Sequence, residues 1–302
     1  MSKNSTAIRL SKGDQIMEIT INIVMSILFL VVLYPLVYVV SSSFSSGDAV
    51  FNGKVILWPV DFSTYGYEIV LKFPKVWTGY KNTIINTVLG TIMNVFTTML
   101  VAYPLSRKEF QGKGFYMFIF MFTMWFGGGL VPSYILMSDL GLVNNRLAVL
   151  LTGLVSISNM VVMRSFFRNS IPGDLHDAAR VDGISDIGYL VKIVLPLSKA
   201  IFSVITLYYA VAHWNSYFTA MIYLMDPSKL TLQQVLKELL AQANPSVEDV
   251  QGMTAEEISN MQYSADLMKY SLIVVSSAPI LCAYPFVQKY FERGVMIGSV
   301  KG

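Results

Sequence analysis

A polar stretch, DLHDAARVDGISDIGYLVKIVLPL (residues 174–197), lies between two apolar runs and carries side chains suited to specific contacts. Pro172 and Gly173 end the preceding helix, and Asp174 is expected to cap a new one. Asp177 would then lie near the positive end of the helix dipole. This pattern predicts a short helix that presents carboxylates at its start.

The same stretch predicts a second short helix after a turn. Ala178 and Ala179 leave one face of the first helix thin, so another backbone or side chain can approach closely. Gly183 follows where a left-handed C-terminal cap favours glycine. A second helix would start at Ser185 or Asp186, run to Leu195 and stop at Pro196. We interpret the segment as a helix–turn–helix elbow with a docking face; the alternative is an interfacial amphipathic loop without a partner.

Neutral polar residues inside apolar runs form a second candidate group, which could line a pathway for a hydroxylated solute. Amides and aromatic faces are the groups that bind such a solute, and the alternative for the asparagines is contact between helices. The candidate pathway residues are Asn94, Asn159, Tyr208, Tyr209, His213 and Asn215.

Residue types needed for several kinds of catalysis are missing from the sequence. It contains two histidines, no H-E-x-x-H pair, no G-x-x-x-x-G-K-[ST] loop and no G-x-S-x-G elbow. Its single cysteine, Cys282, excludes an internal disulfide and a multi-cysteine metal site. We therefore expect a non-catalytic chain with no cofactor or metal site of its own.

Composition places the chain in a membrane. Of its 302 residues 54% are hydrophobic and 14% charged, and the mean hydropathy is +0.55. Soluble domains contain about 25% charged residues. Long, continuous apolar runs favour helices over barrel strands. The predicted fold is an all-α membrane protein whose six transmembrane helices cover residues 19–40, 82–105, 115–136, 147–166, 197–218 and 269–290.

The distribution of lysine and arginine predicts an orientation with both termini in the cytoplasm. Residues 1–18 are predicted to form a cytoplasmic segment, 19–290 the six-span transmembrane domain and 291–302 a cytoplasmic tail. Within the domain, 172–196 is a cytoplasmic loop between spans four and five, and 219–268 is an outer loop. The first span is expected to be an uncleaved anchor, because its apolar run is longer than that of a signal peptide and no A-x-A-like site follows.

The outer loop contains TLQQVLKELLAQA, residues 231–243, with apolar residues at helical spacing. We expect an amphipathic helix that packs on the outer ends of the spans. The alternative is a docking face for a partner.

Residues 174–197 resemble the EAA loop of permease subunits of type I ABC importers, the maltose-transporter-like family for carbohydrate uptake. The family pattern of an EAA triplet, a glycine and a hydrophobic-LPL run is matched by Asp177-Ala178-Ala179, Asp182-Gly183 and Leu195-Pro196-Leu197. Two departures are aspartate in place of the family glutamate at 177 and Ala200 where a proline often stands. The runs WFGGGLVPSYILMSDLGLVNN, HWNSYFTAMIYL and FERGVMIGSVKG resemble the oligosaccharide and polysaccharide branch.

The resemblance implies a division of labour in a prokaryotic plasma or inner membrane. The partners would be a second homologous permease, two ATPase subunits that hold ATP and magnesium, and an extracytoplasmic solute-binding protein. The implied ATPase-coupling residues are Asp177, Ala178, Ala179, Asp182, Gly183, Leu195 and Pro196. Residues 294–302 would reach the ATPase interface or form a frayed tail.

Three other functions remain open from the sequence. A permease of the same family could carry a non-sugar solute. A secondary transporter or channel would need buried ionisable residues and an inverted repeat, and neither is clear. A membrane-embedded enzyme would need clustered catalytic groups, whereas the two histidines are far apart in sequence.

Overall fold

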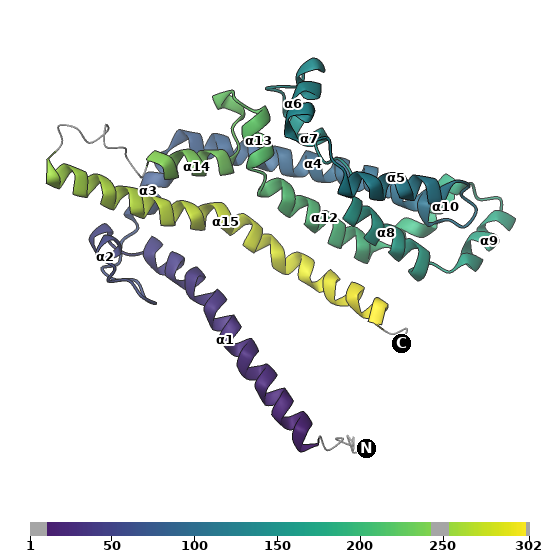
Figure 1. Cartoon of the computed structure of the whole chain (residues 1–302), viewed down its shortest axis with the longest axis horizontal. Coiled ribbons are helices and arrows are strands. Elements are labelled where there is room, and N and C mark those ends of the chain that lie inside the picture. Colours follow the sequence, from purple (N-terminus) through teal and green to yellow (C-terminus); the bar gives the residue numbers. More distant parts are fainter. Residues whose placement is uncertain (1–10, 243–253, 300–302) are drawn as a thin grey trace. The chain divides into compact units, whose positions relative to one another are not determined.

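The structure is a computed structural model that describes residues 11–242 and 254–299. Each secondary-structure element in these ranges is a helix, so the predicted all-α class is confirmed for the described residues (Figure 1). The chain divides into two compact units. Unit 1 comprises Met1–Lys72 and Leu240–Val275, and unit 2 comprises Phe73–Leu239 and Ser276–Gly302.

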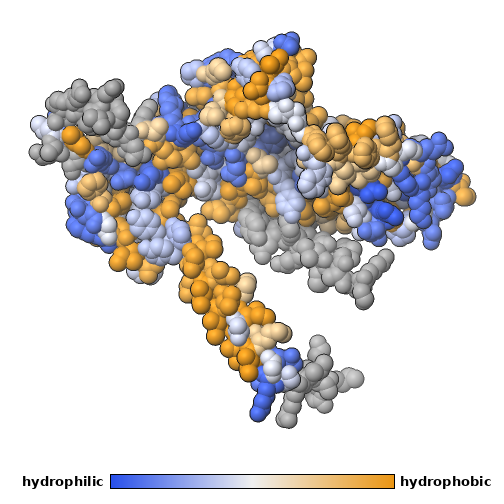
Figure 2. Space-filling view, viewed as in Figure 1, coloured by the Kyte–Doolittle hydropathy of each residue, from blue (hydrophilic) through white to orange (hydrophobic). Residues whose placement is uncertain are grey.

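Unit 1 contains α1 (Lys12–Ser43), an apolar helix that is exposed along most of its length. Ser11 and Asp14 form a capping box at its start. Figure 2 shows a nearly continuous hydrophobic surface along the helix. Such a surface is costly in water, so lipid or another apolar surface must cover it. The unit also contains α2 (Gly47–Phe51), α3 (Tyr65–Lys72) and the first part of α15 (Ala255–Ser299).

Unit 2 is organised around α4 (Pro74–Ser106). This helix packs against α7 (Arg146–Leu151), α8 (Ile157–Ser170) and α12 (Lys199–Trp214). A buried apolar core joins α4, α8, α12 and the elbow segment. The other elements that begin in unit 2 are α5 (Lys113–Trp125), α6 (Leu130–Asp139), α9 (Gly173–Val181), α10 (Asp186–Tyr189), the π-helix η1 (Leu190–Val194), α11 (Leu195–Leu197), α13 (Phe218–Tyr223), the 3-10 helix η2 (Pro227–Lys229) and α14 (Leu232–Gln242).

Several helices are suited to crossing a membrane. Within the described residues, α1, α4 and the stretch Met261–Cys282 of α15 are each long and apolar enough. Two bent helix pairs raise this number to five if each pair is one span. The predicted spans 19–40 and 82–105 lie inside α1 and α4, and 269–290 lies inside α15.

The other predicted spans are not single straight helices. In place of 115–136 the structure has α5 and α6, which are bent by 111° at a glycine-rich break where Gly129 has φ +85°. The predicted span 147–166 is divided into α7 and α8. In place of 197–218, α12 starts after an 83° bend from the preceding helix. Hydropathy missed these breaks because it averages over the short polar or glycine segments that cause them.

The segment predicted as an outer loop, 219–268, is largely helical. It holds most of α13, η2, α14 and the start of α15, while residues 243–253 lie outside the described part. Thr254 starts α15 because its backbone N–H and side chain exchange hydrogen bonds with Glu257. The predicted tail, 291–302, continues α15 as far as Ser299, and residues 300–302 lie outside the described part.

The amphipathic helix α14 forms where the sequence predicts one, and it packs against α4. Leu232, Val235 and Leu239 are buried. The backbone N–H of Leu232 donates to the Thr83 hydroxyl over 2.9 Å. A Cβ atom at Gly79 would lie 3.0 Å from the Leu232 Cα atom, so α4 presents a glycine where the two backbones approach closely. An ion pair between Lys75 and Glu238 joins the same helices.

We expect Leu232→Ala to lower the free energy of unfolding by about 2–5 kcal/mol, because it leaves a cavity at this contact. Leu232 is 0% exposed, whereas Leu140 is 60% exposed and gives a matched control, Leu140→Ala. Thermal unfolding of both variants in one detergent measures the difference. Equal stability of the two variants would show that the α4–α14 contact is not tightly packed.

Candidate functional site

The elbow, defined here as residues 173–197, consists of α9, a turn, and the continuous run α10–η1–α11. Gly183 has φ +72° in the turn, and its N–H donates to the Arg180 carbonyl. The Ser185 hydroxyl accepts from the Gly188 N–H and so caps α10. The expected cap at Asp174 is wrong, because α9 already begins at Gly173 and Asp174 lies in its first turn. Pro196 does not stop the second helix, which ends one residue later, at Leu197.

Burial divides α9 into two sides. His176 and Ala179 are buried, whereas Asp177 and Ala178 are exposed. The expectation of an exposed face formed by both alanines is therefore wrong for Ala179, which lies in the apolar core. Successive residues point in different directions around a helix axis, so Ala179 faces the core while Ala178 faces away from it.

The exposed side of the elbow combines acids with large apolar side chains. Asp182 and Gly183 are exposed beside Val181, which is 88% exposed, and Ile187 is 76% exposed on α10. Pro196 is also exposed, and Leu195 is partly buried. Figure 2 shows hydrophilic residues gathered at the end of the molecule where Figure 1 places α9. The sequence-based site did not include Val181 and Ile187. Two β-branched apolar residues within a polar stretch could have indicated a contact surface there.

A loop after α4 adds charged residues near the elbow. Arg107 and Glu109 form an ion pair of 3.5 Å. A hydrogen bond from its own backbone N–H lowers the pKa of the Glu109 carboxyl, and the nearby Arg107, His176 and Arg180 side chains lower it further. Glu109 is therefore an anion beside the elbow at neutral pH.

The break between α7 and α8 is held by side chains from α4 and α12. The Asn94 amide donates to the Gly153 carbonyl over 3.1 Å, and the Thr97 hydroxyl lies 3.3 Å from the Leu154 carbonyl. The Ser156 N–H donates to the Tyr209 hydroxyl over 2.9 Å. Backbone groups without helical partners are costly in lipid, so these side chains allow the chain to unwind there.

A pocket of about 280 Å³ lies at this break. Five predicted pathway residues, Asn94, Asn159, Tyr208, Tyr209 and His213, line it, and Asn215 does not. The remaining lining residues are small, apolar or hydroxylated: Val149, Thr152, Gly153, Ser156, Ala212, Ser216 and Thr219. The polar groups of this lining are amides, hydroxyls, an imidazole and main-chain groups, and none of the lining residues is lysine, arginine, aspartate or glutamate.

Three of the pathway residues are engaged in contacts between helices. The Asn94 amide oxygen lies 3.1 Å from His213 Nε2 and accepts from it, since the amide nitrogen donates to Gly153. A Cβ atom at Gly90 would overlap the His213 ring, so glycine gives the ring its space on α4. The Tyr209 hydroxyl lies 2.7 Å from the Thr98 hydroxyl as well as accepting from Ser156.

Asn159 differs from these residues. Its backbone N–H lies 3.4 Å from the Ser156 hydroxyl at the start of α8. Its side-chain amide is partly exposed in the pocket and makes no hydrogen bond to any residue that the structure describes. Of the predicted amides, Asn159 is therefore best placed to contact a solute.

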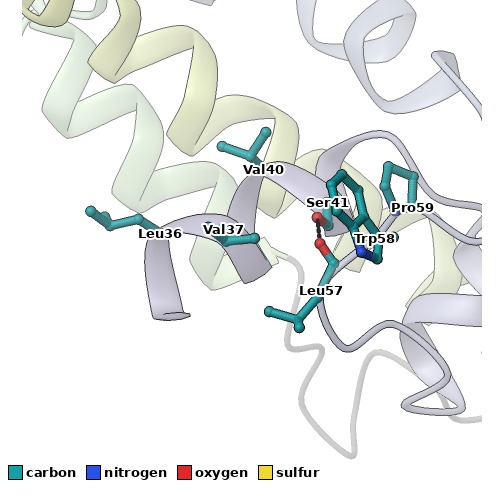
Figure 3. A pocket seen from close by; sticks show the side chains of 7 residues that line it. All are labelled: Leu36, Val37, Val40, Ser41, Leu57, Trp58 and Pro59. Atoms are coloured by element: carbon teal, nitrogen blue, oxygen red, sulfur yellow. Dashed lines mark hydrogen bonds between the residues drawn. The ribbon is translucent and has the colours of Figure 1, made fainter. Parts of the chain in front are cut away.

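A second, apolar groove of about 430 Å³ lies in unit 1 (Figure 3). Figure 3 shows the Ser41 hydroxyl bonded to the Leu57 carbonyl, a contact of 2.6 Å that ties the end of α1 to the following loop. Its lining of Leu36, Val37, Val40, Ser41, Leu57, Trp58 and Pro59 suits an aliphatic chain better than a saccharide.

A family model for the binding-protein-dependent transport system inner membrane component matches residues 76–297. This chain belongs to that family. It is thus a multi-pass membrane permease of an ABC transporter, and the match includes both the elbow and the pocket.

Relatives with named cargo agree with this assignment. The chain is 35% identical to the polygalacturonan/rhamnogalacturonan transport system permease protein YtcP of Bacillus subtilis, over 90% of this chain and 94% of that protein. It is 26% identical to the melibiose/raffinose/stachyose import permease MelC of the same organism, over 82% and 84% of the two chains. A crystal structure of a bacterial ABC transporter involved in the import of the acidic polysaccharide alginate matches with a TM-score of 0.84 and 37% identity, covering 94% of this chain and 100% of that chain.

We expect Asn94→Ala to lower the free energy of unfolding by about 1–2 kcal/mol, because it removes the contacts that join α4 to the break and to His213. Asn159→Ala should change stability by less than Asn94→Ala does, since the Asn159 amide makes no hydrogen bond to another described residue. Thermal unfolding in detergent compares the two variants. Equal losses would show that the Asn94 hydrogen bonds do not hold the break.

Proposed function

We propose that this permease forms half of the transmembrane pathway of an ATP-driven importer for an oligosaccharide or polysaccharide fragment. The observation that supports a saccharide as the transported solute is the pocket at the α7–α8 break. Its amides and hydroxyls can exchange hydrogen bonds with sugar hydroxyls, and Tyr208 and Tyr209 supply aromatic faces. The cargo of YtcP and MelC supports the same class of solute.

The elbow is the element proposed to receive force from an ATPase. Exposed Asp177 would pair with a basic residue of the ATPase, and Ala178 would allow close approach. Exposed Val181 and Ile187 add apolar area that a partner surface would bury. ATP and magnesium would be held in two ATPase subunits. A second homologous permease and an extracytoplasmic solute-binding protein would complete the importer.

The proposed topology has six spans with both termini in the cytoplasm. The spans are α1, α4, the α5–α6 pair, the α7–α8 pair, α12 and α15. The bent and broken helices are compatible with this count, since non-helical backbone is tolerated in a membrane where protein side chains satisfy it. Asn94 and Tyr209 do so at the α7–α8 break.

The assembly is tested by purifying the tagged full-length chain in mild detergent and counting every co-purifying subunit. We expect a second permease and two ATPase copies for each copy of this chain. A chain that transports alone or as a simple homo-oligomer would contradict the importer.

Gly183→Asp should uncouple ATP hydrolysis from uptake, because a non-glycine residue at φ +72° strains the turn by about 1 kcal/mol and shifts the second helix of the elbow. Gly141→Asp is the matched control, since Gly141 has φ +68° and equally open surroundings outside the elbow. Uptake per ATP hydrolysed is measured in proteoliposomes. The coupling role would be excluded if Gly183→Asp coupled as well as the control.

A further inference from the structure

His176 is the polar residue of α9 whose side chain is buried in the protein interior. It is 5% exposed, whereas the aspartates on either side, Asp174 and Asp177, are exposed. Burying a polar side chain is costly unless it gains a specific contact. Among the described residues, His176 contacts the second helix of the elbow in two ways.

The first contact is polar and the second aromatic. His176 Nε2 lies 3.4 Å from the Asp186 carboxylate at the start of α10. The His176 ring meets the Tyr189 ring edge to face, with centroids 5.0 Å apart and an interplanar angle of 75°. Asp186 and Tyr189 are both in α10, one at each end, so the imidazole contacts both ends of that short helix.

Tyr189 continues this chain of contacts toward α4. It is 1% exposed and belongs to the same buried core as Met99, Ala102 and Leu105 of α4. The Arg107 guanidinium, directly after α4, lies 5.5 Å from the Tyr189 ring centroid, in cation–π range. Side chains therefore connect α9 through α10 to the end of α4.

Two backbone hydrogen bonds close the turn between α9 and α10: the Gly183 N–H donates to the Arg180 carbonyl over 3.1 Å, and the Ile184 N–H donates to the Ala179 carbonyl over 2.9 Å. Gly183 has no atom within 4 Å of the place where a Cβ would lie, so the turn is open on that side. Glycine also permits more backbone conformations than any other residue. The backbone bonds fix the end of α9, and side-chain contacts across the turn add a restraint on the direction of α10.

We propose that His176 is a positioning residue that fixes the angle between α9 and α10 and, through Tyr189, attaches the elbow to the end of α4. The hydrogen bond to Asp186 orients the imidazole. Packing of the imidazole ring on Tyr189 fixes how closely α9 approaches the buried core. The consequence for transport rests on the proposed coupling role of the elbow; the structural claim does not.

The test measures the elbow's position in the full-length chain in lipid nanodiscs. Spin labels are attached at Val181→Cys on α9 and Leu100→Cys on α4, both exposed sites, in a Cys282→Ser background. With the native His176, pulsed EPR should give one narrow distribution of distances between the two labels. His176→Ala should broaden or shift it, and His176→Phe, which keeps the ring but loses the bond to Asp186, should have a smaller effect.

Two further variants separate positioning from general stability. Asp186→Asn keeps an acceptor for the imidazole N–H and should retain the narrow distribution. Asp174→Ala, an exposed change on the same helix, should leave it unaltered. The proposal is overturned if His176→Ala gives a distance distribution with the same width and mean as the native protein. It is also overturned if Asp174→Ala broadens the distribution as much as His176→Ala does.

Uptake per ATP hydrolysed is then measured for unlabelled His176→Ala in the assembled importer, where we expect a several-fold loss. A broadened distance distribution with unchanged uptake per ATP hydrolysed would support the positioning role of His176. The same result would contradict the proposed role of the elbow in coupling. The two proposals can therefore fail separately.

Discussion

The interaction on which unit 2 most depends is the set of hydrogen bonds that satisfy the unwound backbone between α7 and α8. Non-helical backbone is tolerated in a bilayer only where protein groups satisfy it or where it lines a water-filled cavity. Asn94 of α4 and Tyr209 of α12 supply partners to Gly153 and Ser156. The Thr97 hydroxyl lies 3.3 Å from the Leu154 carbonyl and 2.7 Å from the Met93 carbonyl of its own helix. The bonds of Asn94 and Tyr209 attach α4 and α12 to the break between α7 and α8, and the same break forms part of the wall of the polar pocket.

The helix α4 links the two candidate sites. Asn94 lies at the pocket, and Arg107 follows the end of the helix beside Tyr189 of the elbow. Thirteen positions at 1.5 Å per residue separate them by about 20 Å along the axis. A packed helix of this length transmits a displacement with little loss, since protein interiors are nearly as dense as crystals. Movement of the elbow would therefore reach the pocket through α4, in keeping with the proposed function.

Predictions from the sequence were accurate where a pattern is local. The long apolar runs became the continuous helices α1 and α4 although Pro35 lies inside α1 and Pro104 near the end of α4. The amphipathic spacing of Leu232, Val235 and Leu239 gave the buried face of α14 correctly. Averaged hydropathy failed at Gly129 and Gly153, where one residue with positive φ divides an apolar run. The side chain facing such a break comes from another part of the chain, so no local window contains both.

The sequence by itself determined that the chain is a helical membrane protein, and the spacing of Asp177, Gly183 and Pro196 indicated its family. Those properties depend on composition and on residues close together in the chain. Only the tertiary structure decided that Ala179 and His176 face inward and that Val181 and Ile187 face outward. It also decided that Asn94 and Tyr209 hold a helix break while the Asn159 amide is left facing the pocket. The physical reason is that burial and hydrogen bonding depend on neighbours 50 or more positions away, as in the bond from Asn94 to Gly153, 59 positions apart.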